Sequence, residues 1–242
     1  MLKLTNVTKK FNDKLVLDAI SLEVRKGSIA VFLGSSGVGK STLLRVLCGL
    51  EKITSGSITL DDVSLSRKHH SVGMVFQHFN LFSHMNVITN ITFPLEQALG
   101  YSHKTAQLLA LELLHKYDLA DKATLCIKGL SGGQKQRLAL IRTLALKPEV
   151  ICFDEPTSAL DPLLTTQVAT SISEVAHQGY TVLVTTHDTL LIEKLPCTIY
   201  LMKKGSIVQS VFSADYWQNP EQYPLINNFI KGYQKTEPET GL

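Results

Sequence analysis

The stretch from residue 34 to residue 42 combines glycine, lysine and hydroxyl side chains in a spacing that can hold a phosphate group. It matches the pattern G-x-x-x-x-G-K-S. An apolar run from Ile29 to Leu33 precedes it and leucines at helical spacing follow it, which is the strand–loop–helix context that the motif requires. Loop N–H groups and the helix dipole can surround an anion, whereas a bare glycine–serine turn is the alternative. The predicted phosphate-binding residues are Gly34, Ser35, Ser36, Gly37, Val38, Gly39, Lys40, Ser41 and Thr42.

Within this loop and one later strand lie the groups that can balance the charge of a triphosphate. Lys40 is expected to reach the β- and γ-phosphates, and the Ser41 hydroxyl is expected to bind Mg²⁺. The apolar segment from Val150 to Phe153 ends in Asp154, which would hold the same ion from the far side. Glu155 follows and could orient and deprotonate a water that attacks the γ-phosphate. Without the loop at residue 34, the same pair of carboxylates would be interpreted as the acidic end of an exposed strand.

A second glycine-rich helix start lies far from the first in the sequence. The run Leu-Ser-Gly-Gly-Gln begins at Leu130 and leads into a helical pattern, so it is another candidate anion site. A single ATP needs only one such loop. The economical explanation is that the second site binds the γ-phosphate of an ATP held by another copy of the chain. The residues of this second site are Ser131, Gly132, Gly133 and Gln134.

Length and composition limit the possible partners. The chain has 242 residues, enough for one large domain or a domain with an inserted subdomain. Its net charge is only +3 and it contains no basic block, which argues against nucleic acid as a partner. No apolar run approaches the ~20 residues that span a bilayer, and the first residues lack a long apolar signal segment. We therefore expect a cytosolic chain that reaches a membrane only through a partner.

The pattern of apolar residues predicts an α/β fold with additions. Strand-like segments that alternate with helical ones indicate a parallel-rich sheet whose strand ends carry the candidate site, including His187. Short β segments at the start, with separate strands at 15–17 and 20–24 among them, predict a small antiparallel sheet, and a turn is expected at Ser55–Ser57. The stretch from 89 to 146 is mainly helical in pattern. We expect it to be an inserted helical subdomain, with the core and antiparallel sheet in 1–88 and 147–242 of a single domain.

These motifs, in this order and spacing, resemble the ATP-binding-cassette (ABC) ATPases over nearly the whole chain. The five-residue run at Leu130 is close to unique to that family, so the resemblance is specific. It implies a P-loop NTPase cassette: a mixed sheet core, an antiparallel β subdomain and an inserted α-helical subdomain. It also implies that two cassettes enclose two ATP molecules head to tail.

The resemblance assigns roles to residues that the motifs alone leave open. Gln77, which follows a strand, is implied to sense Mg²⁺ and water, and His187 to contact the γ-phosphate. Asp161 is implied to lie in a loop at the dimer interface, and Phe11 to stack on adenine. For Gln77, His187 and Phe11 the residues themselves also allow a purely structural role. Gln77 could simply end a strand, His187 could be a surface cap, and Phe11 could pack on the sheet.

The resemblance also indicates what the ATPase would drive. Phe76 to Met85 and Glu155 to Pro162 look like the corresponding stretches of ATPases that serve polar amino-acid importers. This implies a peripheral protein on the cytoplasmic face of the inner membrane. It would dock to a membrane permease through the helical subdomain and the loop after Gln77, and act indirectly with a solute-binding protein. The apolar residues of this loop would either contact the permease or pack inside the helical block; they are Phe79, Leu81, Phe82, Met85 and Val87. Other cargoes, such as methionine or a lipoprotein, and a cell-envelope regulator that moves no solute stay open. Asp188 in place of the more usual glutamate and Gly129 before the motif are departures from the pattern.

Overall fold

The computed structural model describes residues 1–68, 70–158 and 164–234. Its largest sheet has six strands in the order β10-β9-β3-β8-β7-β6, and only the β9–β10 pair is antiparallel. Every residue of β3, β7 and β8 is buried, as expected for strands covered on both faces. The strands are β3 (Ile29–Leu33), β6 (Val72–Val75), β7 (Val150–Asp154), β8 (Thr181–Thr185), β9 (Cys197–Lys203) and β10 (Ser206–Phe212).

A second, antiparallel sheet has the strand order β2-β1-β4-β5, which is the small sheet predicted at the start of the chain. Two details of the prediction are wrong. The expected strands at 15–17 and 20–24 form one strand, because pairing with β1 continues past an irregularity at Ala19, whose φ is 47°. The turn expected at Ser55–Ser57 is instead the start of β4, where Gly56 allows the backbone of β1 to approach closely. The strands are β1 (Leu2–Phe11), β2 (Lys14–Val24), β4 (Ser55–Leu60) and β5 (Val63–Ser64).

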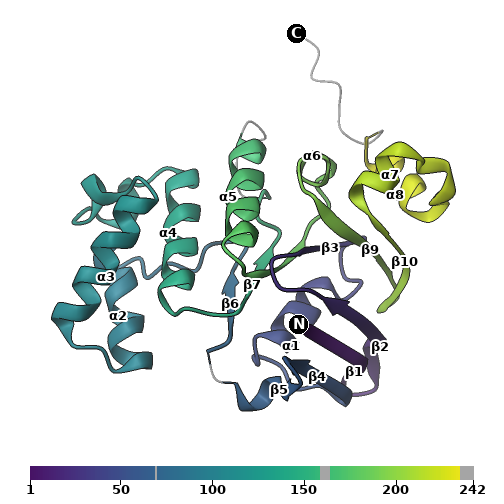
Figure 1. Ribbon diagram of the computed structural model, residues 1–242, viewed down its shortest axis with the longest axis horizontal. Coiled ribbons are helices and arrows are strands. Elements are labelled where there is room, and N and C mark those ends of the chain that lie inside the picture. Colours follow the sequence, from purple (N-terminus) through teal and green to yellow (C-terminus); the bar gives the residue numbers. More distant parts are fainter. Residues whose placement is uncertain (69, 159–163, 235–242) are drawn as a thin grey trace, which may run out of the picture.

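Helices cover both faces of the large sheet (Figure 1). On one side α1 packs with the antiparallel sheet, and on the other side α4, α5 and α6 contribute to a separate apolar cluster. Helices α2 and α3 lie at one end of the molecule, and α7 and α8 at the other (Figure 1). The helices are α1 (Lys40–Leu47), α2 (Val87–Leu99), α3 (His103–Lys116), α4 (Gly132–Ala145), α5 (Thr165–His177), α6 (Thr189–Glu193), α7 (Ser213–Gln218) and α8 (Pro224–Gln234), with short 3-10 turns η1 (Leu65–Arg67), η2 (Ala120–Lys122), η3 (Ile127–Gly129) and η5 (Pro220–Gln222).

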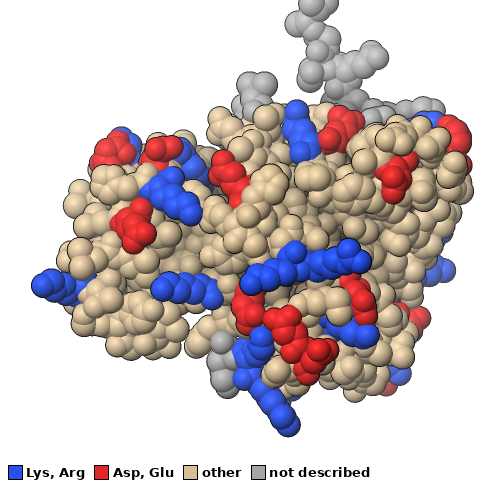
Figure 2. Space-filling model, in the orientation of Figure 1, with Lys and Arg blue, Asp and Glu red and all other residues tan. Residues whose placement is uncertain are grey.

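The surface carries mixed charge. On the face shown in Figure 2, lysine and arginine side chains lie among aspartate and glutamate side chains. Within the described ranges, no helix combines the length and the apolar character needed to cross a membrane.

Candidate nucleotide-binding site

The glycine loop joins the buried strand β3 to helix α1, and its glycines are required by close backbone contacts. A Cβ on Gly34 would lie 2.7 Å from the carbonyl oxygen of Met202, and one on Gly39 would lie 2.7 Å from that of Val16. Gly39 also has a φ of 108°, a value that L side chains rarely adopt. No side chain caps the start of α1, and Ser35, Ser36 and Gly37 are exposed. The loop therefore presents backbone N–H groups to solvent where an anion can bind.

Lys40 folds back over this loop. Its side chain is only 7% exposed, and its Nζ donates to the carbonyl oxygens of Gly34 (2.6 Å) and Ser35 (3.3 Å). The same nitrogen lies 3.6 Å from a carboxylate oxygen of Glu155. The ammonium group is thus held at the mouth of the loop, where a phosphate could take over its contacts.

Asp154, at the end of β7, is the centre of a buried oxygen cluster beside the loop. The Ser41 hydroxyl donates to its Oδ1 (2.8 Å), and the Thr185 hydroxyl from β8 donates to the same oxygen (2.6 Å). Mg²⁺ prefers oxygen ligands and commonly takes one or two carboxylates, with phosphate and water completing its shell. Among the described residues, no group of three or more His, Cys, Asp and Glu side chains could hold a metal. Because two hydroxyl oxygens and a carboxylate converge at one point, the residues present fit Mg²⁺ bound together with a nucleotide. Thr185 was not among the predicted site residues.

Glu155 and His187 come together from neighbouring strand ends. The Nδ1 of His187 lies 2.8 Å from the Oε2 of Glu155, and the Glu155 backbone N–H donates to the carbonyl oxygen of Thr185. Burial raises the pKa of Glu155, but the hydrogen bond from His187 and the charges of His187 and Lys40 bring it below the ordinary value of 4.5. The hydrogen bond with Glu155 raises the pKa of His187 above 6.5. The carboxylate is kept charged beside the loop, as a group that accepts protons must be.

Gln77 and Phe11 are the two further predicted residues that lie near the glycine loop and β7. Gln77 is exposed just beyond β6, the strand that pairs with β7. Phe11 ends β1, is 41% exposed, and lines a groove of about 830 Å³ that runs to the glycine loop. This volume is in the range of small-molecule sites. The groove is lined by Phe11, Asn12, Asp13, Lys14, Leu15, Val16, Gly37, Val38, Thr42, Lys204 and Gly205.

The second helix start lies on the surface. Ser131 is exposed and caps α4: its hydroxyl accepts from the Gln134 N–H, and its own N–H donates to Oε1 of Gln134. Gly132, Gly133 and Gln134 are partly buried. One contact that sequence reasoning missed connects this helix to the carboxylates, because the Gln136 side chain donates to the Pro156 carbonyl oxygen (2.9 Å). Asp161 lies outside the described residues.

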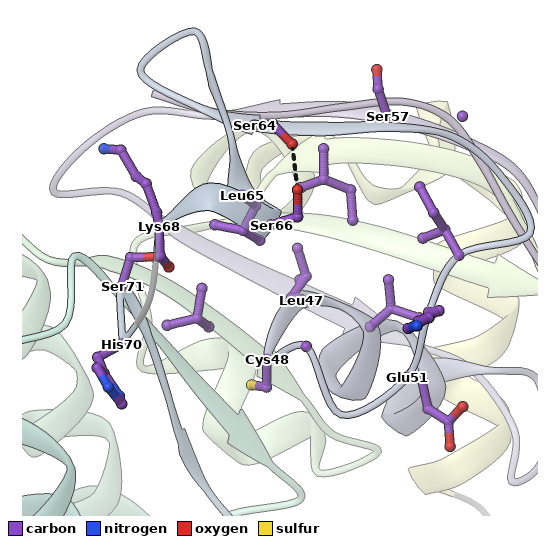
Figure 3. A pocket seen from close by; sticks show the side chains of 17 residues that line it. Leu47, Cys48, Glu51, Ser57, Ser64, Leu65, Ser66, Lys68, His70 and Ser71 are labelled. Atoms are coloured by element: carbon purple, nitrogen blue, oxygen red, sulfur yellow. Dashed lines mark hydrogen bonds between the residues drawn. The ribbon is translucent and has the colours of Figure 1, made fainter. Parts of the chain in front are cut away.

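A separate hollow of about 710 Å³ lies at the opposite end of α1 from the glycine loop, against β4 and η1. None of the predicted site residues lines it. Figure 3 shows the hydrogen-bonded hydroxyls of Ser64 and Ser66 on one side of this hollow and Glu51 on the other. The Glu51 carboxylate points away from these serines. The candidate chemistry is therefore confined to the glycine-loop end of the sheet.

Comparison with known proteins agrees with this geometry. The ABC transporter family matches residues 17–158. The chain is 38% identical over 229 residues to the glutamine transport ATP-binding protein of Geobacillus stearothermophilus, covering 92% of this chain and 95% of that protein. It is 38% identical over 228 residues to the glutamate/aspartate import ATP-binding protein of Escherichia coli K12, covering 91% and 95%.

A solved structure extends the agreement to three dimensions. The ATP-binding cassette MJ0796, described as a dimer in a post-hydrolysis state bound to ADP and Pi, superposes with a TM-score of 0.76. It is 31% identical, with 88% of this chain and 99% of that chain covered. The predicted cassette fold, with its mixed sheet, antiparallel sheet and helical region, is confirmed. Sequence and fold lead to the same conclusion, that this chain belongs to the ABC transporter family as an ATP-binding ATPase.

Proposed function

We propose that the chain is the ATP-hydrolysing subunit of an importer for polar amino acids and that it works as a head-to-tail pair of identical copies. The observation that carries this proposal is the cluster at one end of the sheet, where Lys40 and His187 both lie against Glu155 while Ser41 holds Asp154. The catalytic residues in this proposal are Glu155, His187 and Gln77.

In this proposal hydrolysis depends on positioning and charge. Lys40 and the loop N–H groups hold the phosphates, and Ser41, Gln77 and Asp154 supply oxygen ligands for Mg²⁺, which when bound neutralises charge on the phosphates. Glu155 orients a water and takes its proton. His187 orients the Glu155 carboxylate and contacts the γ-phosphate.

The pairing of two copies is proposed because the glycine loop and Ser131 belong to different parts of the chain. The loop joins β3 to α1 beside Asp154, whereas Ser131 is exposed at the start of α4. A second copy would bring its residues from Ser131 to Gln134 onto the γ-phosphate, with Asp161 in the loop between copies. ATP would then hold the pair together, and hydrolysis would release it.

We propose that the loop after Gln77 and the helical region at 89–146 form the surface that docks to a membrane permease. Of the apolar residues expected to contribute, Phe79 and Val87 are buried within the protein. Leu81, Phe82 and Met85 remain partly exposed and are left for a partner. This docking would place the chain on the cytoplasmic face of the inner membrane.

The docking loop is physically tied to α4. The Arg142 guanidinium donates to the carbonyl oxygens of Asn80 (2.7 Å) and Phe79 (3.0 Å), and its carbon lies 5.5 Å from the centre of the Phe82 ring. Because Ser131 starts the same helix, movement of the docking loop can be transmitted to the residues that close the second copy's site.

Polar amino acids are proposed as the cargo because the similar ATP-binding proteins named above serve glutamine and glutamate/aspartate transport. The test is to identify the membrane protein that co-purifies with the chain, reconstitute both in vesicles, and add a solute-binding protein loaded with single amino acids. A several-fold rise in ATP hydrolysis with a polar amino acid is expected. Stimulation only by methionine or a lipoprotein, or by no solute, would favour the other cargoes or a cell-envelope regulator.

A further inference from the structure

Lys9 is a buried lysine whose charge is held at a defined point. Its residue is 8% exposed, and lysines are almost never this buried unless they are paired. Its Nζ donates to Oε2 of Glu51 (3.0 Å) and to the carbonyl oxygen of Lys52 (2.9 Å). Both partners lie in the segment that follows α1, so the ammonium group connects β1 to the end of the phosphate-loop helix.

The same ammonium group lies over an aromatic ring. Lys9 Nζ is 4.4 Å from the centroid of the Phe11 ring, within the range of a cation–π interaction. Phe11 lines the groove that leads to the glycine loop, but Lys9 does not. The ring therefore contacts both the groove and the cation, and the cation itself is not part of the groove lining.

This arrangement has two physical consequences for a base that enters the groove. The ring is held in one orientation by a charge that is itself fixed by two hydrogen bonds, so less conformational freedom is lost on stacking. The cation also draws the π-electron density of the ring toward itself, which favours contact between the rest of the ring and an electron-rich purine.

We propose that Lys9, held by Glu51 and the Lys52 carbonyl, is a positioning residue that makes the Phe11 ring a platform for the adenine base. The proposal rests on the proposed stacking role of Phe11. It adds that recognition of the base depends on a buried charge that never touches the nucleotide. The carboxylate of that ion pair comes from the rim of the second hollow, not from the nucleotide groove (Figure 3).

The test compares binding of ATP with binding of inorganic tripolyphosphate, which carries the phosphates but no base. Calorimetry would give both dissociation constants for Lys9→Met, Lys9→Arg and, as a matched control, Lys10→Met, which changes the exposed lysine next along β1. Lys9→Met should weaken ATP binding roughly threefold to tenfold, as expected when the Phe11 ring must lose its conformational freedom on stacking. It should leave tripolyphosphate binding unchanged. Lys9→Arg should restore ATP affinity, and Lys10→Met should change neither ligand.

Two further variants separate the possible failures. Phe11→Ala should weaken ATP binding at least as much as Lys9→Met; if it has no effect, the stacking role of Phe11 is wrong and this inference falls with it. If Phe11→Ala weakens ATP binding but Lys9→Met does not, only the role of Lys9 is wrong. Equal loss of ATP and tripolyphosphate in Lys9→Met would mean that Lys9 merely supports the fold. Should that variant not fold, Glu51→Gln, which keeps the cation but loosens it, must show a smaller selective loss for ATP.

Discussion

The two helix starts, at α1 and at α4, are built in opposite ways. Helix α1 follows Gly39, which offers no side chain to its first turn, and the loop around it is packed against Val16 and Met202. Helix α4 follows Ser131, which satisfies the first turn through a capping box with Gln134 and is exposed to solvent. The first start is rigid and open to an anion, whereas the second is complete without one.

This difference indicates how the two sites are used. A helix start with uncapped N–H groups inside a packed loop is preorganised for phosphate within one chain. A self-capped helix start on the surface is stable by itself and is accessible to a phosphate that another body presents. The comparison therefore supports the proposal that the two helix starts have different roles. The glycine loop would bind ATP, and the start of α4 would contact ATP bound by a second copy.

The largest expected effect is a loss of ATP turnover when the Glu155 carboxylate, beside the glycine loop, is replaced. Glu155→Gln should lower ATP turnover by about 100-fold or more, because an amide cannot take a proton from water. ATP binding should persist, so light scattering should detect a dimer in the presence of ATP. Glu149→Gln is the matched control, because Glu149 lies just before the same strand and pairs with Lys68 on the surface. Turnover of Glu155→Gln close to that of this control would show that another group is the base.

The next effect contrasts one glycine from each helix start. Gly39→Ala forces a side chain into a left-handed backbone, which costs about 1–2 kcal/mol, and onto the Val16 carbonyl oxygen, so denaturant titration should show a marked loss of stability. Gly133 has an ordinary backbone, and a Cβ there would lie 3.7 Å from a methyl group of Leu164. Gly133→Ala should therefore keep or raise stability while lowering ATP turnover. Equal destabilisation by both would remove the contrast between the sites.

A smaller effect separates the capping role of Ser131 from its proposed contact with phosphate. Ser102 caps α3 by accepting from the Thr105 N–H, as Ser131 does for Gln134. Ser131→Ala and Ser102→Ala should each lose about 1 kcal/mol of stability. Only Ser131→Ala should reduce turnover, and it should not change ATP affinity at low protein concentration. If both variants lose the same activity, α4 acts only as a structural helix.

The smallest effect is the pH dependence of the Glu155–His187 pair. His187 has a raised pKa, so its stabilising contribution is complete below 6.5 and is lost as pH rises through its folded pKa. Glu155 has a lowered pKa, so its contribution is present above 4.5 and is lost as pH falls through its folded pKa. NMR titration of His187 should give a pKa above 6.5 that falls in Glu155→Gln. An unchanged value in that variant would mean that the pair does not interact in solution.

Local motifs predicted which elements carry the candidate site residues, because their spacing constrains the backbone over short distances. The glycine loop between β3 and α1, and Asp154 and Glu155 after β7, are visible as contiguous runs. Thr185 could not be found in this way. It reaches Asp154 only because β7 and β8 are neighbours in the sheet, and a threonine at a strand end carries no distinguishing pattern.

The continuity of a strand and the burial of individual side chains were harder to predict than the motifs. Strand β2 looked broken because Ala19 interrupts its alternation, yet pairing with β1 continues on both sides. The sequence left open whether Phe79 and Val87 face a partner or pack inside the protein, and both are buried. In each case packing against a distant segment decided the outcome, and no local window contains that segment.

The sequence by itself determined the two candidate anion-binding helix starts, the candidate carboxylates and the α/β class, because each depends on residues that are adjacent along the chain. Only the tertiary structure decided that His187 meets Glu155, that α4 caps itself at the surface, and that Lys9 lies over Phe11. The first contact depends on strand order, and the last depends on Glu51 and Lys52, which are far from Lys9 in sequence and hold its ammonium group. The α4 cap is local, and only its exposure is decided by the fold. The free energies of these contacts come from burial and geometry, which a linear pattern does not specify.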